Sequence, residues 1–255
     1  MPSDKVKYFS LNKIGRDFCI GDLHGQYDCL LDALDMVRFD YHKDRLFAVG
    51  DLIDRGDESI ICLSLIKEPW FHAVMGNHEL AFLCEVAPQL VRNEYISEIN
   101  DFKNSWRDNG GSWYYDHPDL KDFLHDLIPI IANMPFVMVV ETTFGRINIA
   151  HAELKKDHLD ISEKSLFNIS DNDIDNNNFD MDSVLWGRER ILAHIEDSLV
   201  ADMTEWLSPT FVGHTPVDDP IKIGNCFYID TGCYETKKLT IVEISNNQLP
   251  IVTTN

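Results

Sequence analysis

Three short segments of this sequence place metal-type ligands directly after an apolar run of residues. The first segment carries Asp22 and His24, the second Asp51, and the third Asn77. All of these side chains offer oxygen or nitrogen atoms and none offers a thiolate, a donor set that suits Mn²⁺, Fe or Zn²⁺ better than a soft cluster. The residue types therefore predict a site for divalent cations that is built from several loops.

The spacing of these ligands predicts two ions and not one. Asp22 and His24 are two residues apart beyond a strand end, so both point to the same side and can share the first ion. Asp51 has two carboxylate oxygens, with which it can bridge the first ion to a second. The second ion would take one amide oxygen and two imidazoles, which are offered by Asn77, His151 and His214.

The charge of such a centre indicates what it would do. Two divalent ions and two carboxylates leave about one positive charge even after a hydroxide has bound between the ions. A metal pair roughly 3.5 to 4 Å apart lowers the pKa of the bridging water and stabilises an in-line displacement at phosphorus. The predicted chemistry is therefore hydrolysis of a phosphate ester.

Four further polar residues complete the predicted site. His78 directly follows a metal ligand, so its side chain is expected to point away from the ions toward the substrate, where a protonated imidazole can donate to the leaving oxygen. Asp54 is predicted to orient and charge that imidazole. Arg55 and Arg188, together with Asn77, are predicted to bind the phosphate oxygens. A lone histidine or arginine of this kind is more often structural, and only the combination of motifs favours a catalytic site.

Alternating strands and helices must position these ligands. The apolar runs predict strands over residues 17–20, 45–49 and 71–75, with helices over 27–37 and 58–66 between them. This alternation implies parallel strands with right-handed crossovers. The three ligand segments would then lie at one end of the same sheet, which is where open α/β sheets bind ligands.

The middle of the chain is predicted to form a helical cap at about residues 90–128. Helical periodicity covers 78–86 and 120–128, and the stretch between them is polar and aromatic, with Trp106 and Trp113. Either these tryptophans fill core or the segment forms a lid over the site, and plain packing is favoured because a tryptophan buries a large area. Further strands are predicted over 135–140, 146–150, 210–212, 227–230 and 239–244.

Residues 153–183 are rich in aspartate and asparagine. Their alternating aspartates are typical of a calcium loop, but Asn176 stands where that loop needs glycine and Asp182 stands where it needs glutamate. We therefore predict an acidic surface loop, with calcium binding as the weaker alternative.

Composition favours a single cytoplasmic domain without nucleic-acid or membrane partners. The 255 residues, 44% of them hydrophobic, suffice for one domain with a buried core. A formal charge of −21 argues against binding to a phosphate backbone. The six cysteines form no Cys-x-x-Cys pair, which is typical of reduced thiols in the cytoplasm, and no apolar run is long enough to span a membrane.

The ligand segments resemble the signature of a known enzyme family. Residues 21–25 match Gly-Asp-x-His-Gly, residues 50–56 match Gly-Asp-x-x-Asp-Arg-Gly, and residues 76–79 match Gly-Asn-His-Glu. These motifs, followed by two separate histidines, resemble those of the metal-dependent phosphoprotein phosphatases, which are calcineurin-like metallophosphoesterases. From about residue 18 to residue 242 the sequence looks most similar to the bacteriophage lambda type of serine/threonine protein phosphatase.

The resemblance implies an α/β fold, a β-sandwich flanked by helices, in a single domain over residues 1–255. It implies a first ion on Asp22, His24 and Asp51, and a second ion on Asp51, Asn77, His151 and His214. It also implies His78 as general acid held by Asp54, with Arg55 and Arg188 on the phosphate.

The family mechanism implied by the resemblance is direct attack by metal-activated water, without a phosphoenzyme. The two ions would be Mn²⁺, with Fe, Zn²⁺ or Ni²⁺ as alternatives. Because Asp230-Thr231-Gly232 stands where eukaryotic members carry Ser-Ala-Pro-Asn-Tyr, no regulatory subunit is implied.

Three hypotheses about function follow. The leading one is a serine/threonine protein phosphatase that acts on phosphoproteins or phosphopeptides, with phosphotyrosine as a further substrate. The nearest alternative is a symmetrical diadenosine tetraphosphate hydrolase, which resembles this family in its metal motifs but usually carries alanine at the position of Asp54. A non-catalytic module that binds phosphorylated partners is disfavoured, because every catalytic position is filled.

Overall fold

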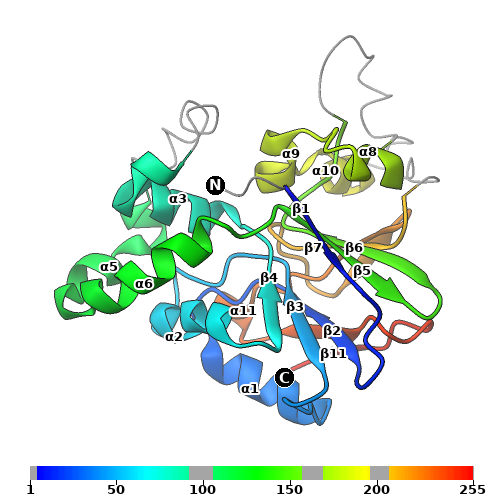
Figure 1. Cartoon of the computed structure of the whole chain (residues 1–255), viewed down its shortest axis with the longest axis horizontal. Helices are drawn as coiled ribbons and strands as arrows, with labels where there is room; N and C mark the ends of the chain where they lie inside the picture. Colours follow the sequence, from blue (N-terminus) through cyan, green and yellow to red (C-terminus); the bar gives the residue numbers. More distant parts are fainter. Residues whose placement is uncertain (1–4, 92–105, 157–168, 196–206, 255) are drawn as a thin grey trace.

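Two β-sheets are stacked face to face at the centre of the structure (Figure 1), a computed structural model that describes residues 5–91, 106–156, 169–195 and 207–254. Helices cover the outer face of each sheet. The predicted α/β sandwich flanked by helices is confirmed.

The five-stranded sheet has the order β11-β10-β2-β3-β4. Its first three strands along the chain, β2, β3 and β4, are parallel, and β10 runs antiparallel to both β2 and β11. The predicted strands over 17–20, 45–49 and 71–75 are therefore confirmed, together with their parallel order. The strands are β2 (Asp17–Ile20), β3 (Arg45–Ala48), β4 (Phe71–Ala73), β10 (Thr240–Glu243) and β11 (Ile251–Thr253).

The six-stranded sheet has the order β1-β5-β6-β7-β9-β8. A hairpin joins β5 to β6, as predicted, whereas β6, β7 and β9 lie parallel. The strands are β1 (Val6–Phe9), β5 (Val137–Thr142), β6 (Gly145–Ala150), β7 (Thr210–Val212), β8 (Ile221–Ile223) and β9 (Cys226–Tyr228).

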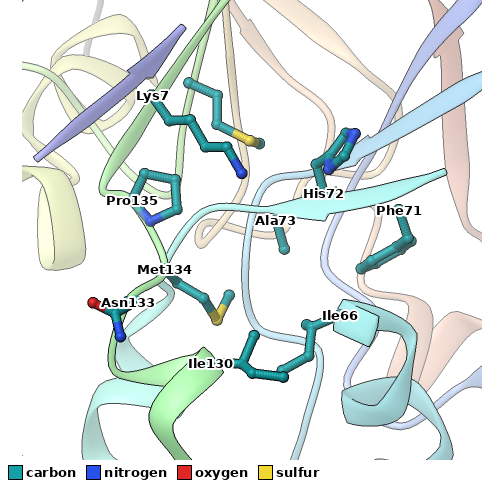
Figure 2. A pocket seen from close by; sticks show the side chains of 10 residues that line it. Lys7, Ile66, Phe71, His72, Ala73, Ile130, Asn133, Met134 and Pro135 are labelled. Carbon is teal, nitrogen blue, oxygen red and sulfur yellow. The ribbon is translucent and has the colours of Figure 1, made fainter. Parts of the chain in front are cut away.

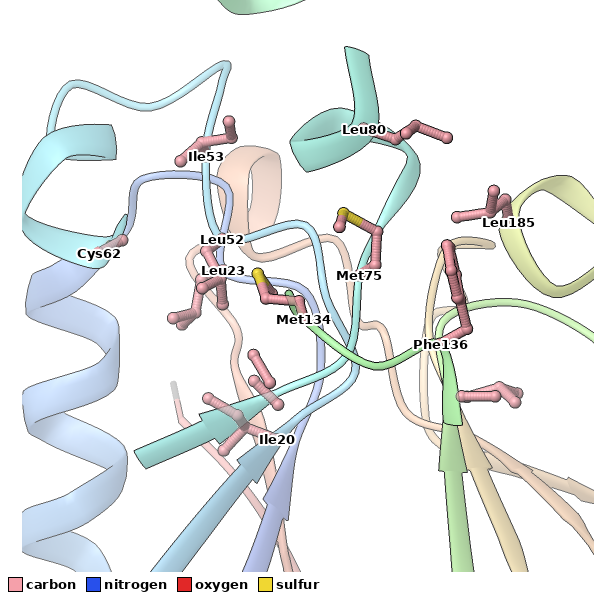
Figure 3. Packing of buried hydrophobic residues seen from close by; sticks show 14 of the residues in the cluster. Ile20, Leu23, Leu52, Ile53, Cys62, Met75, Leu80, Met134, Phe136 and Leu185 are labelled. Carbon is pink, nitrogen blue, oxygen red and sulfur yellow. The ribbon is translucent and has the colours of Figure 1, made fainter. Parts of the chain in front are cut away.

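Alternation along the strands divides the buried residues between two cores. In β2 and β3, Cys19 and Phe47 point between the sheets, where they join Met138 and Ile149 of the opposite sheet. Their neighbours in sequence point to the opposite face of the sheet, under the helices. There they belong to a second core, which also includes residues of the loops at the strand ends and of α3, as Figure 3 shows around Ile20. Burial of a side chain such as Phe47 contributes about 1.5–3 kcal/mol to the free energy of unfolding. Because side chains are buried on both faces of the sheet, both faces stabilise the positions of the strands.

Most helices lie where the sequence predicts them. α1 (Tyr27–Met36) follows β2, and α2 (Ser59–Ser64) continues into the 3₁₀ turn η1 (Leu65–Lys67). α3 (Asn77–Val86) follows β4 and precedes the short turn η2 (Pro88–Leu90).

The described part of the predicted cap lies beside α3 (Figure 1). Residues 92–105 of that prediction lie outside the described residues. The cap consists of the turn η3 (Arg107–Gly111), α5 (Trp113–Asp116), the turn η4 (Pro118–Leu120) and α6 (Lys121–Ile131).

Two short helices interrupt the predicted acidic loop where the structure describes it. α8 (Asp171–Asp175) and α9 (Met181–Trp186) occupy most of residues 169–186, and α10 (Glu189–Ile195) follows, while residues 157–168 of the predicted loop lie outside the described part. The sequence interpretation overlooked the capping box in which Ser170 and Asp173 bond reciprocally at the start of α8. The second short helix is capped by Asp180, whose side chain accepts from the Ser183 amide at 3.0 Å.

The strands that the sequence failed to predict, β1, β8 and β11, all lie at the edges of the sheets. An edge strand is buried on fewer sides, and β1 shows this because its two central residues are exposed. Without alternating burial there is no period of two in the sequence to detect. In the described residues, no helix combines the length and the apolar character needed to cross a membrane.

Candidate metal centre and active site

The first three ligand segments meet at one edge of the five-stranded sheet. β2, β3 and β4 are parallel, so the chain leaves all of them at the same edge. The backbone amides of Leu23 and His24 both donate to the carbonyl oxygen of Asp51, at 3.1 and 2.9 Å, which fixes the first loop against the second. The structure thus brings these segments together as their parallel order predicts.

The six-stranded sheet supplies the two remaining histidines. His151 directly follows β6, and His214 follows the parallel neighbour β7 after one glycine. The Gly213 amide donates to the His151 carbonyl oxygen at 2.8 Å, which ties the two strand ends together. The candidate site therefore lies where the ends of both sheets meet.

Glu79 holds the loop that carries Asp51. Asp51 has a φ of 48°, in the left-handed region that costs a non-glycine residue about 1–3 kcal/mol. The buried Glu79 carboxylate accepts hydrogen bonds from the amides of Asp51 at 2.9 Å, Leu52 at 2.8 Å and Gly76 at 3.0 Å. Burial, together with the nearby Asp51 charge, raises the pKa of Glu79 to about 8. Sequence reasoning missed this role, although a glutamate at the third position of a helix is known to accept from the N-cap amide, as Glu79 does from Gly76.

The two oxygens of Asp51 face two different groups of ligands. Oδ2 lies 3.6 Å from His24 Nε2, and Oδ1 lies 3.5 Å from His151 Nε2. A carboxylate whose oxygens diverge in this way is suited to bridge two cations.

On one side of Asp51, His24 presents a lone pair. Its Nδ1–H donates to the Ile53 carbonyl oxygen at 2.9 Å, which leaves Nε2 unprotonated toward Asp51. Burial lowers the pKa of His24 to about 3, so the ring is neutral. Neutral imidazole with a fixed second nitrogen is the usual state of a metal-ligating histidine.

On the other side of Asp51, the Asn77 amide oxygen and one ring nitrogen each of His151 and His214 converge. His151 Nδ1–H donates to the Val49 carbonyl oxygen at 2.8 Å, so its Nε2 also carries a lone pair. That atom lies 2.8 Å from Asn77 Oδ1 and 3.2 Å from His214 Nδ1, which is itself 3.1 Å from Asn77 Oδ1. A lone pair that faces an amide oxygen without a hydrogen between them is unfavourable, and a divalent cation accepts electrons from both atoms. The residues present therefore fit a metal ion.

Asp22 lies next to these groups, but its surroundings differ from those of Asp51. Its carboxylate accepts from the His214 amide, at 3.1 Å for the nearer oxygen. Burial raises its pKa well above the usual value, and the charges of Asp230 and Asp51 add to this effect. Sequence reasoning gave Asp230 no role, yet it supplies a third buried carboxylate, and burial raises the pKa of Asp230 to about 6. Such crowded carboxylates fit a nearby cation.

His78 and Asp54 form a buried pair. His78 Nδ1–H donates to Asp54 Oδ2 at 2.6 Å, as the sequence predicts. Burial alone would lower the pKa of His78, but Asp51 and Asp54 outweigh it and raise the pKa. His78 lines the cavity described below, and its Nε2 lies 3.8 Å from Asp51 Oδ2, so the imidazole stands beside the proposed metal ligands.

Two tryptophans of the cap also bind Asp54. Trp106 Nε1–H donates to Asp54 Oδ2 at 2.6 Å, and Trp113 Nε1–H donates to Oδ1 at 2.7 Å. Both rings also pack against Phe82 of α3. The interpretation of the tryptophans as plain packing was therefore incomplete, since their polar edges contact the candidate active site.

The two predicted phosphate-binding arginines flank the site. Arg55 has a φ of 68° and donates from Nη1 to His24 Nε2 at 2.7 Å. Its guanidinium lies 4.6 Å from the ring centre of Tyr234. Arg188 is exposed just before α10 and donates to Thr215 Oγ1 at 3.3 Å. Both side chains are accessible to a ligand.

A cavity of about 250 Å³ joins these parts, and most of the predicted site residues line it. Asp22, His24, Asp54 and His151 lie outside its lining. The lining residues are Asp51, Arg55, Asn77, His78, Asn109, Trp186, Arg188 and His214.

Figure 2 shows a second, smaller cavity of about 100 Å³ beside β4, lined by Lys7, His72 and Met134 among others. None of the predicted site residues lines that second cavity. The first cavity is therefore the candidate active site.

Comparison with known proteins identifies the family. The family model described as calcineurin-like phosphoesterase matches residues 18–238. The chain belongs to the calcineurin-like phosphoesterases. This family uses a binuclear metal centre, in agreement with the two groups of ligands around Asp51. The chain is thus a metal-binding phosphatase of the calcineurin-like phosphoesterase family.

Relatives and solved structures agree with this assignment. The chain is 32% identical over 228 residues to serine/threonine-protein phosphatase 2 of Salmonella typhimurium, covering 88% of this chain and 91% of the relative. It is 41% identical over only 88 residues to the symmetrical bis(5'-nucleosyl)-tetraphosphatase of Nitrosospira multiformis, covering 33% of this chain and 32% of the relative. A crystal structure provisionally named a diadenosine tetraphosphatase superimposes with a TM-score of 0.62 at 19% identity, over 98% of this chain and 97% of the other, which shows the shared fold.

Proposed function

We propose that this calcineurin-like phosphoesterase is a serine/threonine protein phosphatase that also accepts phosphotyrosine. The observation that carries the proposal is the buried His78–Asp54 pair beside a cavity flanked by two arginines. A full-length relative with the name of such a phosphatase supports it. The substrates would be phosphoproteins or phosphopeptides in the cytoplasm, with no nucleic acid, membrane or regulatory subunit required.

Two divalent ions, for which Mn²⁺ is our leading choice, would be held one on each side of Asp51. When bound, the ions supply a hydroxide nucleophile and positive charge for the phosphoryl oxygens. The chain contributes oxygens and neutral imidazoles, whose second nitrogens are already hydrogen-bonded in His24 and His151. The ligands in this proposal are Asp22, His24, Asp51, Asn77, His151 and His214.

His78 would protonate the leaving oxygen of the substrate. A serine or threonine alkoxide is a poor leaving group, so a positioned acid accelerates its departure by about 10²–10⁴-fold. The two carboxylates that raise the pKa of His78 keep the imidazole charged for this step, and Asp54 fixes Nδ1 so that Nε2 carries the transferred proton.

The arginines would bind the phosphate. Arg55 Nη2 lies 3.2 Å from His78 Nε2, and both groups carry N–H when His78 is protonated. An anion in the adjoining cavity can accept from both groups, and Arg188, with the Asn77 amide, lines the same cavity. This arrangement favours a phosphate monoester whose leaving oxygen is directed toward His78.

The decisive experiment compares substrate classes on one metal-loaded preparation. Phosphate release would be measured with a phosphoserine peptide, a phosphotyrosine peptide, p-nitrophenyl phosphate and diadenosine tetraphosphate, each after chelation and reloading with Mn²⁺, Fe²⁺, Zn²⁺ or Ni²⁺. We expect the highest kcat/KM for the phosphoserine peptide with Mn²⁺.

The short 41% match to a tetraphosphatase makes diadenosine tetraphosphate hydrolysis the second candidate. Faster turnover of the dinucleotide than of the peptide would select this alternative. No turnover of any substrate with any metal, at intact peptide binding, would indicate a non-catalytic binding module.

A further inference from the structure

We propose that Trp106 and Trp113 are positioning residues for general-acid catalysis, and that they act through Asp54. The inference rests on the proposed function of His78 as the acid. Asp54 receives three N–H donors, from His78 Nδ1 and from Trp106 Nε1 on Oδ2 and from Trp113 Nε1 on Oδ1. Because the carboxylate is fully buried, these groups replace the water that would otherwise hydrate it.

The chemistry of indole makes these contacts specific. An indole N–H donates one hydrogen bond and accepts none, so each tryptophan can only bind an acceptor oxygen at this place. The two donors bind different oxygens and therefore fix the rotation of the Asp54 carboxyl plane. With that plane fixed, Oδ2 stays in line with His78 Nδ1, and the imidazole keeps Nε2 directed at the cavity.

The same helix carries the acid and the support for both indoles. Phe82 lies four residues after His78 in α3, one helical turn away. Its ring stacks on Trp113 with centres 5.8 Å apart and lies 5.9 Å from Trp106. The position of the donors is thus tied to the position of the imidazole that they help to orient.

The backbone between the tryptophans contacts the same loop. The Arg55 amide donates to the Gly110 carbonyl oxygen at 3.4 Å. Gly110 has a φ of 109°, and a Cβ atom there would lie 2.4 Å from the Arg55 nitrogen. Glycine is therefore required for the cap to approach the loop closely enough for the indoles to reach Asp54.

The test separates positioning from folding by the choice of leaving group. Trp106→Phe and Trp113→Phe keep an aromatic ring and remove the N–H. With Mn²⁺ loaded, we expect each variant to lower kcat for a phosphoserine peptide about tenfold, the order for loss of one buried charged hydrogen bond, with KM unchanged. Hydrolysis of p-nitrophenyl phosphate should change less than about threefold, because nitrophenolate departs without a proton.

A matched control removes an indole elsewhere. Trp70 precedes β4 and packs against Phe39, Tyr41 and Phe71, away from the cavity. Trp70→Phe should therefore leave kcat unchanged for both the phosphoserine peptide and p-nitrophenyl phosphate. An equal loss on both substrates in the cap variants, or no loss on either, would overturn the inference.

A double-mutant cycle covers the case of partial misfolding. Trp113→Phe in an Asp54→Asn background should cause no further loss on the phosphoserine peptide, because its partner is already altered. A further loss of about tenfold would show that Trp113 acts through the fold, and the inference would fail.

A measurement without turnover tests the contacts themselves. In a spectrum of ¹⁵N-labelled indoles, Asp54→Asn should shift the two N–H signals that disappear in Trp106→Phe and Trp113→Phe, and leave that of Trp70 in place. Unmoved cap signals would contradict the inference. Because this readout needs no phosphatase activity, an inactive native chain would count against the proposed function and not against these contacts.

Discussion

Asp51 and Asp54 belong to the same loop, but their surroundings are opposite in kind. Asp51 accepts one amide N–H, that of His78, and faces the unprotonated nitrogens of His24 and His151, whereas in the described part of the chain Asp54 accepts from three side-chain N–H donors. A buried carboxylate among lone pairs needs a cation, and one among donors is satisfied by the protein alone. The difference supports our proposal that one end of the loop binds metal and the other orients the acid.

The largest effect should come from the metal side of this comparison. Asp51→Asn removes the bridging charge, so we expect both ions to bind more weakly and kcat to fall by a factor on the order of 10³ or more, since several kcal/mol of transition-state stabilisation depend on the ions. Metal content by mass spectrometry and kcat with added Mn²⁺ would be measured together. If the variant still bound two ions tightly per chain, Asp51 would not be the bridging ligand, and the proposed difference between Asp51 and Asp54 would fail.

Asp54→Asn tests the other side. The variant should keep its metal content and lose about 10²-fold in kcat for a phosphoserine peptide, because the acid loses its partner. Wild-type protein, chelated and reloaded in parallel, is the control for metal loading. Loss of metal from this variant, or unchanged turnover, would show that Asp54 does not have the separate role assigned here.

His214→Ala should have a smaller effect that is confined to one of the two ions. Its Nδ1 lies among the atoms around Asn77 and His151, and removal of a ligand should weaken that ion about tenfold to a hundredfold while the ion next to His24 remains. A titration with Mn²⁺ should change from two tight steps to one tight and one weak step. Loss of both steps would mean that the two groups of ligands do not act separately.

The smallest effect lies outside both aspartates and concerns stability. His72 of β4 packs between Phe9 and Phe47, and burial, with Lys7 and Arg45 nearby, lowers its pKa to about 4. In the unfolded chain His72 binds a proton near pH 6.5, whereas in the folded chain it stays neutral until about pH 4. The stability that neutral, buried His72 contributes is therefore fully present above pH 6.5 and is lost as the pH falls toward 4.

His72→Phe should remove on the order of 2 kcal/mol of that acid sensitivity without any change in kcat. Thermal unfolding of both proteins between pH 4 and pH 7.5 would check it. If the stability of the two proteins fell equally as the pH was lowered, His72 would not be the source of the acid sensitivity.

The sequence predicted the convergence of the ligand loops much better than the contacts between the cap and Asp54. Asp22, His24 and Asp51 follow strands that adjoin in one sheet, so local motifs and parallel order sufficed to bring them together. By contrast, Trp106 and Trp113 reach Asp54 across 52 and 59 residues. No periodicity reports such a contact, and a tryptophan in a helical stretch is equally typical of core.

Short-range signals were also overlooked. Glu79 accepts from the N-cap amide at the start of α3, and α8 and α9 begin at side-chain caps made by Ser170 and Asp180. The edge strands β1, β8 and β11 could not be predicted from alternation, because they are stabilised by backbone pairing with a neighbour and not by two buried faces.

The backbone bonds from Leu23 and His24 to the Asp51 carbonyl have a consequence for the order of assembly. They join main-chain atoms, and the Glu79 carboxylate, which is none of the proposed ligands, accepts from main-chain amides of the same loop. None of these bonds depends on a ligating side chain. In small zinc domains the metal drives folding, because no site exists beforehand. Here the bonds that hold the loops involve no ligating side chain, so we expect chelation to leave the chain folded and cations to be exchanged during the lifetime of one folded molecule.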